Sequence, residues 1–421
     1  MKNTFKLSIS FLLFLISFTS AFAETNATGF ASGADVSWTT EMEASGKKFY
    51  DAAGTQTECM SLLKNLGMNS IRLRVWVNPT GAYNNKADVL AKAIRANNLG
   101  MRIMIDFHYS DTWADPANQT KPAAWTSLSL ADLKTAVTTH TTDILSTLKT
   151  NGITPEWVQV GNETSNGMLW TDGKASTSMA NYAALTTTGY NAVKAIFPNA
   201  KVVVHLNNGY DNSLYRWIFD GLKNNGGKWD VIGLSVYPPF YTTANDWQNC
   251  NIKCLANMND MVARYGSEVM VVECGMSWDA PATCKSFLTD LIAKTKSVTS
   301  GKGTGVFYWE PQCYGSWKGY SLGAFDNTGK PTIALDAFNS STAVESPIEN
   351  QVSLSVDRQN KQLLFSALMN KIEIITINGV ITKSVTKSNS ISTAQLPKGL
   401  YLVRTTRAAT VHPTVTRFIQ D

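Results

Sequence analysis

Short apolar runs alternate with longer amphipathic or polar segments between residues 30 and 310 of the chain. This alternation is typical of repeated strand and helix units around a parallel sheet. Eight repeats within about 280 residues fit a (β/α)8 barrel. A doubly wound sheet is the alternative, but no glycine-rich phosphate-binding turn follows the first run. The eight predicted strands are Ala34–Ser37, Ser70–Trp76, Arg102–His108, Trp157–Glu163, Lys201–Leu206, Val231–Tyr237, Val269–Glu273 and Gly305–Glu310.

A polar or aromatic residue stands at the end of nearly every predicted strand. In a barrel of this type the carboxyl ends of the strands surround one opening, where the active site lies. One such residue could be a hydrogen-bonded core group, but a whole set at one rim indicates a functional site. The set comprises Asp35, Arg74, His108, Asn162, Glu163, His205, Tyr237, Glu273 and Trp309.

The first residues resemble a secretory leader. Lys2 and Lys6 precede an apolar stretch from Leu7 to Phe18, and Ala21-Phe22-Ala23 supplies small residues for cleavage before Glu24. The apolar stretch is too short to span a bilayer, so a membrane anchor is the weaker alternative. The sequence therefore predicts an exported protein, located in the periplasm, at the cell surface or outside the cell.

The pattern changes after residue 343. A linker is followed by short β-rich runs, Lys371–Ile377 and Gly399–Val403, and Asn378-Gly379 is a hairpin signal between two such runs. The sequence predicts a signal peptide over residues 1–23, a catalytic barrel over 24–343, a linker over 344–350 and a β-sandwich-like module over 351–421. Asn378-Gly379 and Leu396–Val403 resemble the β-sandwich or secretion-sorting tails of exported bacterial enzymes.

Charge argues against a nucleic-acid partner. The formal net charge is +5, and residues 345–421 carry nine Lys or Arg against five Asp or Glu, so the predicted barrel is close to neutral. It therefore offers no basic face to a polyanion. The 12 Trp residues favour a ligand with flat, stackable faces.

The six cysteines suit a compartment that permits disulfides. Cys250 and Cys254 are close in sequence, but no second ligand pair stands nearby to complete a zinc site. We expect one local disulfide, Cys250–Cys254, and we expect Cys274 to be a free thiol in the core.

Glu163 and Glu273 fall at the ends of the fourth and seventh predicted strands, which face one another across an eight-stranded ring. A retaining glycosidase needs two carboxyl groups about 5 Å apart, one as nucleophile and one as acid and then base. Asn162 could bind the sugar 2-hydroxyl. We expect Arg74 to keep Glu273 ionised, while Glu163, with weaker pairing, holds a proton near neutrality.

Several motifs together resemble the family 53 glycoside hydrolases, which are arabinogalactan endo-β-1,4-galactanases with barrel folds. The resemblance covers roughly residues 30–340, and the run His108-Tyr-Ser-Asp-Thr-Trp-Ala-Asp-Pro116 is its most specific part. The motifs are Gly33–Ser37, Arg72–Trp76, Asp106–Pro116, Gly161–Glu163, Gly233–Pro238 and Trp309–Pro311.

The resemblance implies that Glu163 is the acid and base and that Glu273 is the nucleophile. It also implies that Asn162, Arg74 and Tyr237 surround the reacting sugar and that Trp309 lies beneath it. The substrate would be galactan or arabinogalactan, and we expect a monomer without a cofactor.

A bound metal is not expected. Several bacterial members of the family carry a long calcium-binding loop after the eighth strand. Here the segment Pro311–Phe338 is short, and its only carboxylates are Asp326 and Asp336, whereas calcium takes six to eight oxygen ligands.

Two rival functions remain open. Another endo-glycanase of the same clan, a β-mannanase or xylanase, would use the same two carboxylates in a cavity lined by different residues. A non-catalytic glycan-binding barrel could instead use Trp113, Trp278 and Trp317 as a stacking surface, but it would not need both Glu163 and Glu273.

Overall fold

The computed structural model describes residues 29–339, 354–376, 380–406 and 414–420. The chain divides into two compact units, residues 1–341 and 342–421. The predicted signal peptide, the predicted linker and the Asn378-Gly379 turn lie outside the described residues. Within them, no helix is long and apolar enough to cross a membrane.

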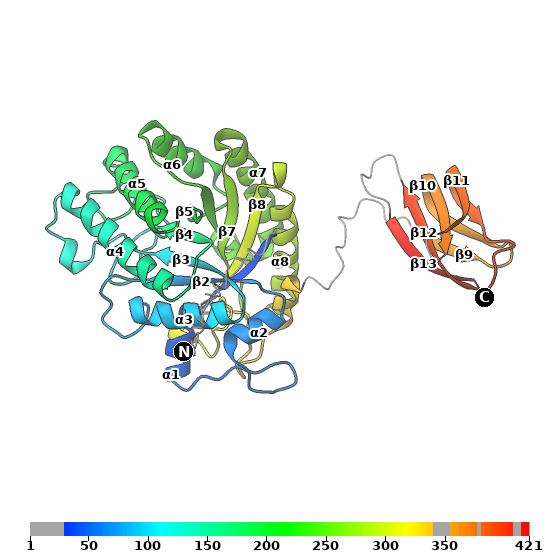
Figure 1. The fold of residues 1–421 in the computed structure, drawn as a ribbon, viewed down its shortest axis with the longest axis horizontal. Coiled ribbons are helices and arrows are strands. Elements are labelled where there is room, and N and C mark those ends of the chain that lie inside the picture. The colour runs from blue at the N-terminus through cyan, green and yellow to red at the C-terminus, as the bar shows by residue number, and fades with distance from the viewer. Residues whose placement is uncertain (1–28, 340–353, 377–379, 407–413, 421) are drawn as a thin grey trace, which may run out of the picture. The chain divides into compact units, whose positions relative to one another are not determined.

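The first unit is a closed barrel of eight parallel strands in the order of the sequence, as predicted, with helices on its outside (Figure 1). The strands are β1 (Ala31–Asp35), β2 (Ser70–Val75), β3 (Arg102–Phe107), β4 (Trp157–Val160), β5 (Lys201–Leu206), β6 (Val231–Val236), β7 (Glu268–Cys274) and β8 (Gly303–Trp309). The helices are α1 (Thr39–Ala44), α2 (Cys59–Asn65), α3 (Lys86–Asn98), α4 (Leu130–Thr150), α5 (Met179–Ile196), α6 (Asn212–Asn224), α7 (Trp247–Tyr265) and α8 (Pro281–Lys296).

Short 3-10 segments occupy several connections. They are η1 (Ala123–Trp125), η2 (Pro238–Phe240), η3 (Ala244–Asp246), η4 (Thr299–Gly301), η5 (Trp317–Gly319) and η6 (Ile333–Phe338). Two of them, η2 and η5, follow β6 and β8 and therefore lie in loops at the carboxyl end of the barrel, where sites form in this fold.

Side chains that alternate along each strand fill two different cores. One set packs outward against the helices, as Val158 and Val160 of β4 do. The other set fills the barrel interior with Ala31, Met104, Trp157, Val203, Val231, Met270, Val272 and Phe307. Gly33 is required beside this plug, because a Cβ atom there would lie 2.3 Å from the Phe307 ring. The apolar plug leaves the upper interior to polar side chains.

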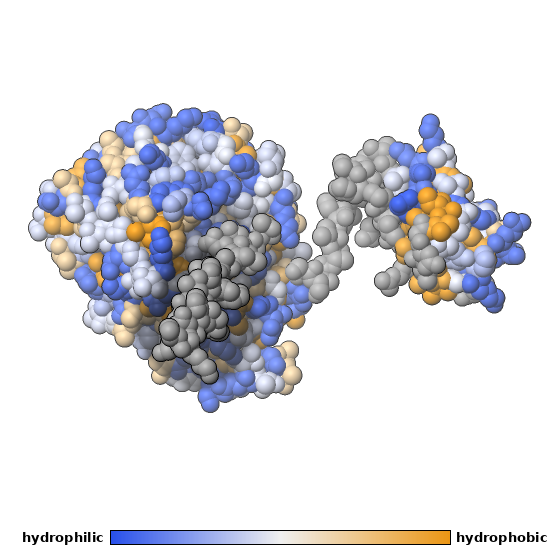
Figure 2. Space-filling view, viewed as in Figure 1, coloured by the Kyte–Doolittle hydropathy of each residue, from blue (hydrophilic) through white to orange (hydrophobic). Residues whose placement is uncertain are grey.

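The C-terminal unit is β-rich, as predicted. Its antiparallel strands are β9 (Leu354–Asp357), β10 (Gln362–Thr376), β11 (Ile381–Ser392), β12 (Gly399–Thr406) and β13 (Thr414–Gln420), in the order β11-β10-β12-β13 with β9 also on β10. A register irregularity between Leu364 and Met369 divides the long strand β10. Leu363 and Phe365, before the irregularity, share one apolar cluster with Ile372 and Ile374 after it. Figure 2 shows hydrophobic side chains on the outer surface of this unit as well.

Candidate active site

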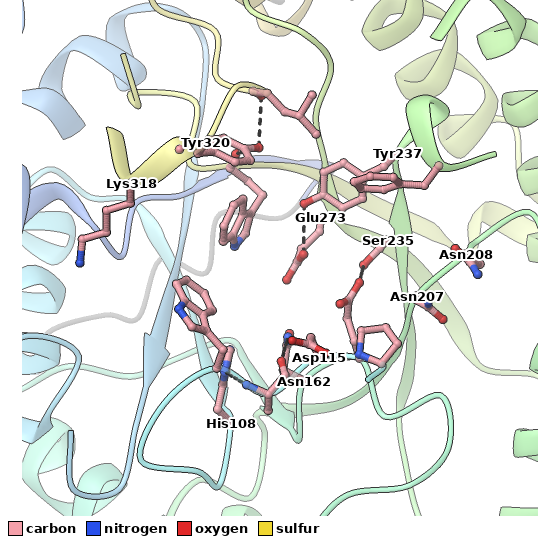
Figure 3. A pocket seen from close by; sticks show the side chains of 18 of the residues that line it. His108, Asp115, Asn162, Asn207, Asn208, Ser235, Tyr237, Glu273, Lys318 and Tyr320 are labelled. Carbon is pink, nitrogen blue, oxygen red and sulfur yellow. Dashed lines mark hydrogen bonds between the residues drawn. The ribbon is translucent and has the colours of Figure 1, made fainter. Parts of the chain in front are cut away.

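A cavity of about 660 Å³ opens at the carboxyl ends of the barrel strands. Figure 3 shows Glu273 near its centre, with Lys318 and Tyr320 at one end and Asn207 and Asn208 at the other. The described residues that line it are Trp38, His108, Trp113, Ala114, Asp115, Pro116, Asn162, Glu163, Asn207, Asn208, Ser235, Tyr237, Phe240, Glu273, Trp309, Lys318, Gly319, Tyr320, Ser321 and Leu322.

Glu163 and Glu273 face one another in this cavity, and carboxylate oxygens of the two lie within 4.8 Å. Glu163 follows β4, and its backbone has a φ of 44°, in the left-handed region that non-glycine residues rarely adopt. Such strain persists where the surroundings hold a side chain in a particular direction. The structure therefore brings the two predicted carboxylates together.

A bulge in β7 directs Glu273 into the cavity. In the register between β6 and β7, Leu234 pairs with Val271 and Ser235 pairs with Glu273, so Val272 is the extra residue. Val272 already faces the barrel interior, and regular alternation would turn the next side chain outward. The bulge restores the inward direction for Glu273, which is a common use of bulges near active sites.

Arg72, and not Arg74, pairs with Glu273. The Arg72 Nη1 atom lies 2.8 Å from Glu273 Oε1 and 2.8 Å from Asp35 Oδ2, and Arg72 Nη2 lies 2.9 Å from Asp106 Oδ2. The expectation that Arg74 holds Glu273 ionised is therefore wrong. Both arginines point into the barrel because they stand two residues apart on β2, but Arg72 is one layer deeper, at the level of Glu273.

Arg74 lies behind the wall of the cavity. Its guanidinium is 3.6 Å from Glu310 and stacks on the Trp113 ring, with its central carbon 4.1 Å from the ring centroid. Its three nitrogens make no hydrogen bond to the described residues. This contact with Trp113 is a cation–π interaction, so Arg74 supports an aromatic side chain of the cavity from outside.

Tyr237 holds the other oxygen of Glu273. Its hydroxyl donates to Glu273 Oε2 over 3.1 Å. Burial raises the pKa of the Tyr237 hydroxyl well above its ordinary value, and the nearby Glu273 carboxylate adds to the effect. Tyr237 therefore acts as a hydrogen-bond donor at this position.

A hydrogen-bonded chain reaches Glu163 from the barrel interior. His205 Nε2 lies 2.7 Å from Ser235 Oγ, and the Ser235 hydroxyl donates to Glu163 Oε1 over 2.6 Å. The backbone N–H of Glu163 and the amide of Gln159 face His205 Nδ1. Because the Ser235 hydroxyl gives its one hydrogen to Glu163, the Nε2 atom of His205 donates to Ser235 Oγ and carries the ring proton. Burial also lowers the pKa of His205 well below its ordinary value, which keeps the ring neutral.

Asn162 is fixed by contacts on both sides of its amide. Its Oδ1 atom accepts from Arg72 Nη2 over 2.9 Å and from Gln159 Nε2 over 3.0 Å. Its Nδ2 atom donates to the Ala114 carbonyl over 2.8 Å. One hydrogen of Nδ2 is then left to point to a ligand, since an amide nitrogen carries two donors.

Both carboxyl groups of the pair titrate above the ordinary range. Burial raises the pKa of Glu163, and the hydrogen bond from Ser235 opposes the rise. Burial also raises the pKa of Glu273, against the lowering effect of Arg72, and the charge of Glu163 raises it further. Two groups that interact this strongly titrate as a pair, and the pair holds one proton over an interval near neutrality.

Aromatic side chains form one wall of the cavity. The Trp309 ring lies 5.1 Å from Trp38, 5.9 Å from Trp113 and 4.8 Å from Tyr320, centroid to centroid. His108 also lines the cavity, with Nε2 3.0 Å from Asp106 Oδ2 and Nδ1 accepting from the Ala114 N–H. A wall of this kind suits the apolar face of a sugar ring.

Not every predicted residue reaches the cavity. Asp35, Arg74 and His205 lie buried behind it, and Trp278 and Trp317 are not among the described residues that line it. Trp317 packs partly buried against the main core. Of the stacking surface expected from Trp113, Trp278 and Trp317, only Trp113 lines this cavity, and a binding role for the other two stays a prediction.

The expected Cys250–Cys254 disulfide is also wrong, because all six cysteines are free and buried. Both residues lie in helix α7. Side chains four residues apart on a helix have Cβ atoms about 5–6 Å apart, whereas a disulfide requires about 3.5–4.5 Å. Cys274 is a free core thiol, as predicted.

The carboxylates considered for calcium have local partners. Asp326 accepts from the N–H and the hydroxyl of Thr328 in a turn, and Asp336 pairs with Lys285 at 2.9 Å. Ligand atoms of Glu163, His205 and Glu273 lie within 4.8 Å of one another, but the hydrogen bonds to Ser235, Tyr237 and Arg72 account for this cluster. That the protein needs no metal stays a prediction.

Comparisons with known proteins bear on this site. A family model described as "Glycosyl hydrolase family 53" matches residues 31–338. The chain belongs to this family. It is 34% identical over 305 residues to a probable arabinogalactan endo-beta-1,4-galactanase A of Neosartorya fischeri, covering 66% of this chain and 83% of the relative. It is 33% identical over 349 residues to an arabinogalactan endo-beta-1,4-galactanase of Cellvibrio japonicus, covering 74% and 90%.

A solved structure also supports the assignment of this chain to family 53. One from a study of two fungal beta-1,4-galactanases superposes with a TM-score of 0.69 at 29% identity, covering 74% of this chain and 100% of the other. The predicted resemblance to the family is confirmed.

Sequence reasoning missed several side chains of this family 53 site. Arg72, Asp106 and Ser235 each precede a predicted site residue by two positions, and Gln159 precedes Asn162 by three. Because strand side chains alternate, residues two positions apart share the inner face of the barrel. Polar residues at such pairs of positions were the available signal. Asn207 and Asn208 follow β5 in a loop, where periodicity gives no signal.

Proposed function

We propose that this glycosyl hydrolase cleaves internal β-1,4-galactosidic bonds of galactan and type I arabinogalactan with retention of anomeric configuration. The family and the galactanase names of its relatives support the substrate class. The observation that carries the mechanism is the separation of Glu163 and Glu273, whose carboxylate oxygens lie within 4.8 Å. Retaining enzymes have carboxyl groups about 5–5.5 Å apart, and inverting enzymes leave room for a water between them.

Glu273 acts as the nucleophile. Its ion pair with Arg72 favours the carboxylate form, and the Tyr237 hydroxyl fixes one of its oxygens. The carboxylate attacks the anomeric carbon of the bound galactose, and a covalent glycosyl-enzyme forms as the glycosidic bond breaks.

Glu163 acts as the acid in the first step and as the base in the second. The pair holds one proton near neutrality, and Arg72 contacts Glu273 directly, so the proton lies on Glu163. Glu163 gives this proton to the departing glycosidic oxygen. When Glu273 becomes an ester its charge disappears, the pKa of Glu163 falls, and Glu163 can take a proton from the attacking water.

Asn162 and the aromatic wall bind the sugar that reacts. The free hydrogen of Asn162 Nδ2 is directed to the sugar 2-hydroxyl, a contact that strengthens in the transition state. Trp309, with Trp38 and Trp113 beside it, offers flat apolar surface beneath the ring. His108 completes the edge of the wall, because its two ring nitrogens are held by Asp106 and by the Ala114 N–H.

The test is a reducing-sugar assay on potato galactan, arabinogalactan, mannan and xylan, with NMR of the first product formed. We expect activity on the first two and a β-configured reducing end at the earliest time. Activity on mannan or xylan without galactan would favour the rival endo-glycanase. Binding to galactan without release of reducing ends would favour a glycan-binding barrel, and an α-configured product would contradict double displacement.

A further inference from the structure

Glu310 is a buried carboxyl group that the preceding mechanism does not use. It follows Trp309 at the end of β8, its side chain is fully buried, and its backbone has a φ of 50°, in the left-handed region. A non-glycine residue keeps this conformation only where its surroundings require it. Glu310 is also the middle residue of the motif Trp309–Pro311, so the sequence and the backbone both single it out.

The Glu310 carboxylate accepts hydrogen bonds from two neighbours. The backbone N–H of Trp38 lies 3.1 Å from Oε1 and 3.2 Å from Oε2, and Gln312 Nε2 donates to Oε2 over 2.6 Å. Arg74 adds its charge, with Nη1 3.6 Å from Oε1. Burial raises the pKa of Glu310, whereas Arg74 and both donors act to lower it. Glu310 therefore fixes the backbone of Trp38, whose side chain lines the cavity.

Arg74, the partner of Glu310, lies among three tryptophan rings. The central carbon of its guanidinium is 4.1 Å from the ring centroid of Trp113, 5.1 Å from that of Trp76 and 5.7 Å from that of Trp38. Trp113 and Trp38 line the cavity, and Trp76 packs edge-on against Trp113. A cation binds an aromatic face most strongly where water is excluded. One buried cation therefore contacts the aromatic wall from behind.

The burial of this pair lowers the stability of the fold. None of the three guanidinium nitrogens of Arg74 makes a hydrogen bond to the described residues, and neither does Oε1 of Gln312. Buried polar groups without hydrogen bonds are destabilising, and apolar side chains of similar volume often replace a buried ion pair without loss of stability. The need to fill space therefore does not explain Arg74 and Glu310.

We propose that Arg74 and Glu310 are positioning residues that set the orientation of the aromatic wall against the bound sugar. Neither lines the cavity, so each acts through its neighbours. Arg74 acts through the rings of Trp113 and Trp38, and Glu310 acts through the backbone of Trp38 and of Trp309, the residue before it. The centroids of these three rings lie between 5.1 and 5.9 Å apart, so a shift of one ring displaces the others.

This inference rests on the proposed function, which places the reacting sugar on the wall. Stacking holds the sugar both before and during the reaction. A contact that is lost in both states raises KM and changes kcat little. Partial unfolding has a different signature, because it lowers the apparent kcat and leaves the KM of the folded fraction unchanged. A rise in KM therefore distinguishes positioning from a role in stability alone.

The experiment compares purified full-length wild-type protein, Arg74→Met and the double variant Arg74→Met/Glu310→Gln on galactan. The double variant removes both charges of the pair, so it buries no uncompensated charge and should keep the fold. We expect KM to rise about fivefold or more in both variants, with kcat within about threefold of wild type. The near-UV circular dichroism of the tryptophans should also change, because it depends on fixed ring packing.

Arg102→Met is the matched control. Arg102 also stacks on a tryptophan, with its central carbon 4.4 Å from the Trp157 centroid, and its Nε atom donates to Glu156 over 2.6 Å. It begins β3, at the amino end of the barrel, and does not line the cavity. Its replacement should lower stability and leave KM for galactan within about twofold of wild type.

Wild-type KM and wild-type circular dichroism in the double variant would overturn the proposal, because the pair would then only balance its own charges. An equal rise of KM in Arg102→Met and Arg74→Met would also contradict it, because the effect would not be specific to the wall. A wild-type protein without activity on galactan would instead overturn the proposed function, and the circular dichroism of the variants would still test the pair.

Discussion

Arg72 Nη1 lies 2.8 Å from Oε1 of Glu273, and both side chains are buried. The same guanidinium contacts Asp35 and Asp106 at 2.8 and 2.9 Å. One cation thus serves three carboxylates in the upper barrel, and the proposed nucleophile is the only one of the three that also lines the cavity. Arg72 therefore connects the stability of the barrel to its chemistry.

Replacing Arg72 should lower both the stability of the barrel and its activity on galactan. Arg72→Met leaves buried carboxylates without their counter-charge, which should lower the free energy of unfolding by about 3–5 kcal/mol. It should also lower kcat/KM on galactan by about 10³-fold or more, because Glu273 loses the charge that keeps it ionised. Urea unfolding and steady-state kinetics measure the two effects.

Arg74→Met is the matched comparison, because Arg74 stands two residues away on the same strand and does not touch Glu273. It should keep at least about tenfold more activity than Arg72→Met. A larger loss of activity in Arg74→Met would show that the contact between Arg72 and Glu273 is not the one that matters.

The loss of activity in Glu163→Ala should depend on how much the leaving group of each substrate needs protonation. Galactan, whose leaving alkoxide must be protonated, should lose about 10³-fold or more, whereas a dinitrophenyl galactobioside should lose far less in the first step. Pre-steady-state release of dinitrophenol measures that step. Equal losses on both substrates would mean that Glu163 positions the substrate and does not donate a proton.

Ser235→Ala should move the alkaline limb of the pH–rate profile. Activity falls as pH rises through the pKa of Glu163, because the acid loses its proton. The Ser235 hydroxyl stabilises the ionised carboxylate and lowers this pKa. Its removal should raise the pKa and shift the limb to higher pH by about one unit. An unchanged limb, or a shift to lower pH, would contradict the assignment of Glu163 as the group that titrates there.

The barrel and the two facing carboxylates of its cavity could be predicted because their signals are local and repeated. Apolar runs mark each strand, and Glu163 and Glu273 stand at the ends of two of them. The pairing of Glu273 could not be predicted, because Arg72 and Arg74 have the same chemistry and face the same side of β2. Only the depth of each residue, set by strand register and by the bulge at Val272, distinguishes them.

The tryptophans and cysteines show a second limit. Trp113 lines the cavity and Trp278 and Trp317 are not among its lining residues, and periodicity gives no signal for residues in loops at the rim. Cys250 and Cys254 looked like a disulfide from spacing alone, but the helix that contains them holds their Cβ atoms too far apart.

Deleting residues 342–421 should leave the barrel folded and active. The two units are compact on their own, and every described residue of the cavity belongs to the first. Activity on galactan should stay within about twofold of the full chain, as expected for independent domains. Loss of the thermal unfolding transition of the barrel after truncation would show that the C-terminal unit is needed for its fold.

The most direct test of the proposed mechanism is to trap the covalent intermediate. A dinitrophenyl 2-deoxy-2-fluoro-β-galactobioside should form the covalent ester faster than the ester is hydrolysed. The fluorine slows both steps, whereas the good leaving group accelerates only the first, so the ester accumulates. Mass spectrometry of the peptic digest should then find the fluorinated disaccharide on Glu273. A label on Glu163 or on another residue, or no label after complete release of dinitrophenol, would contradict the account.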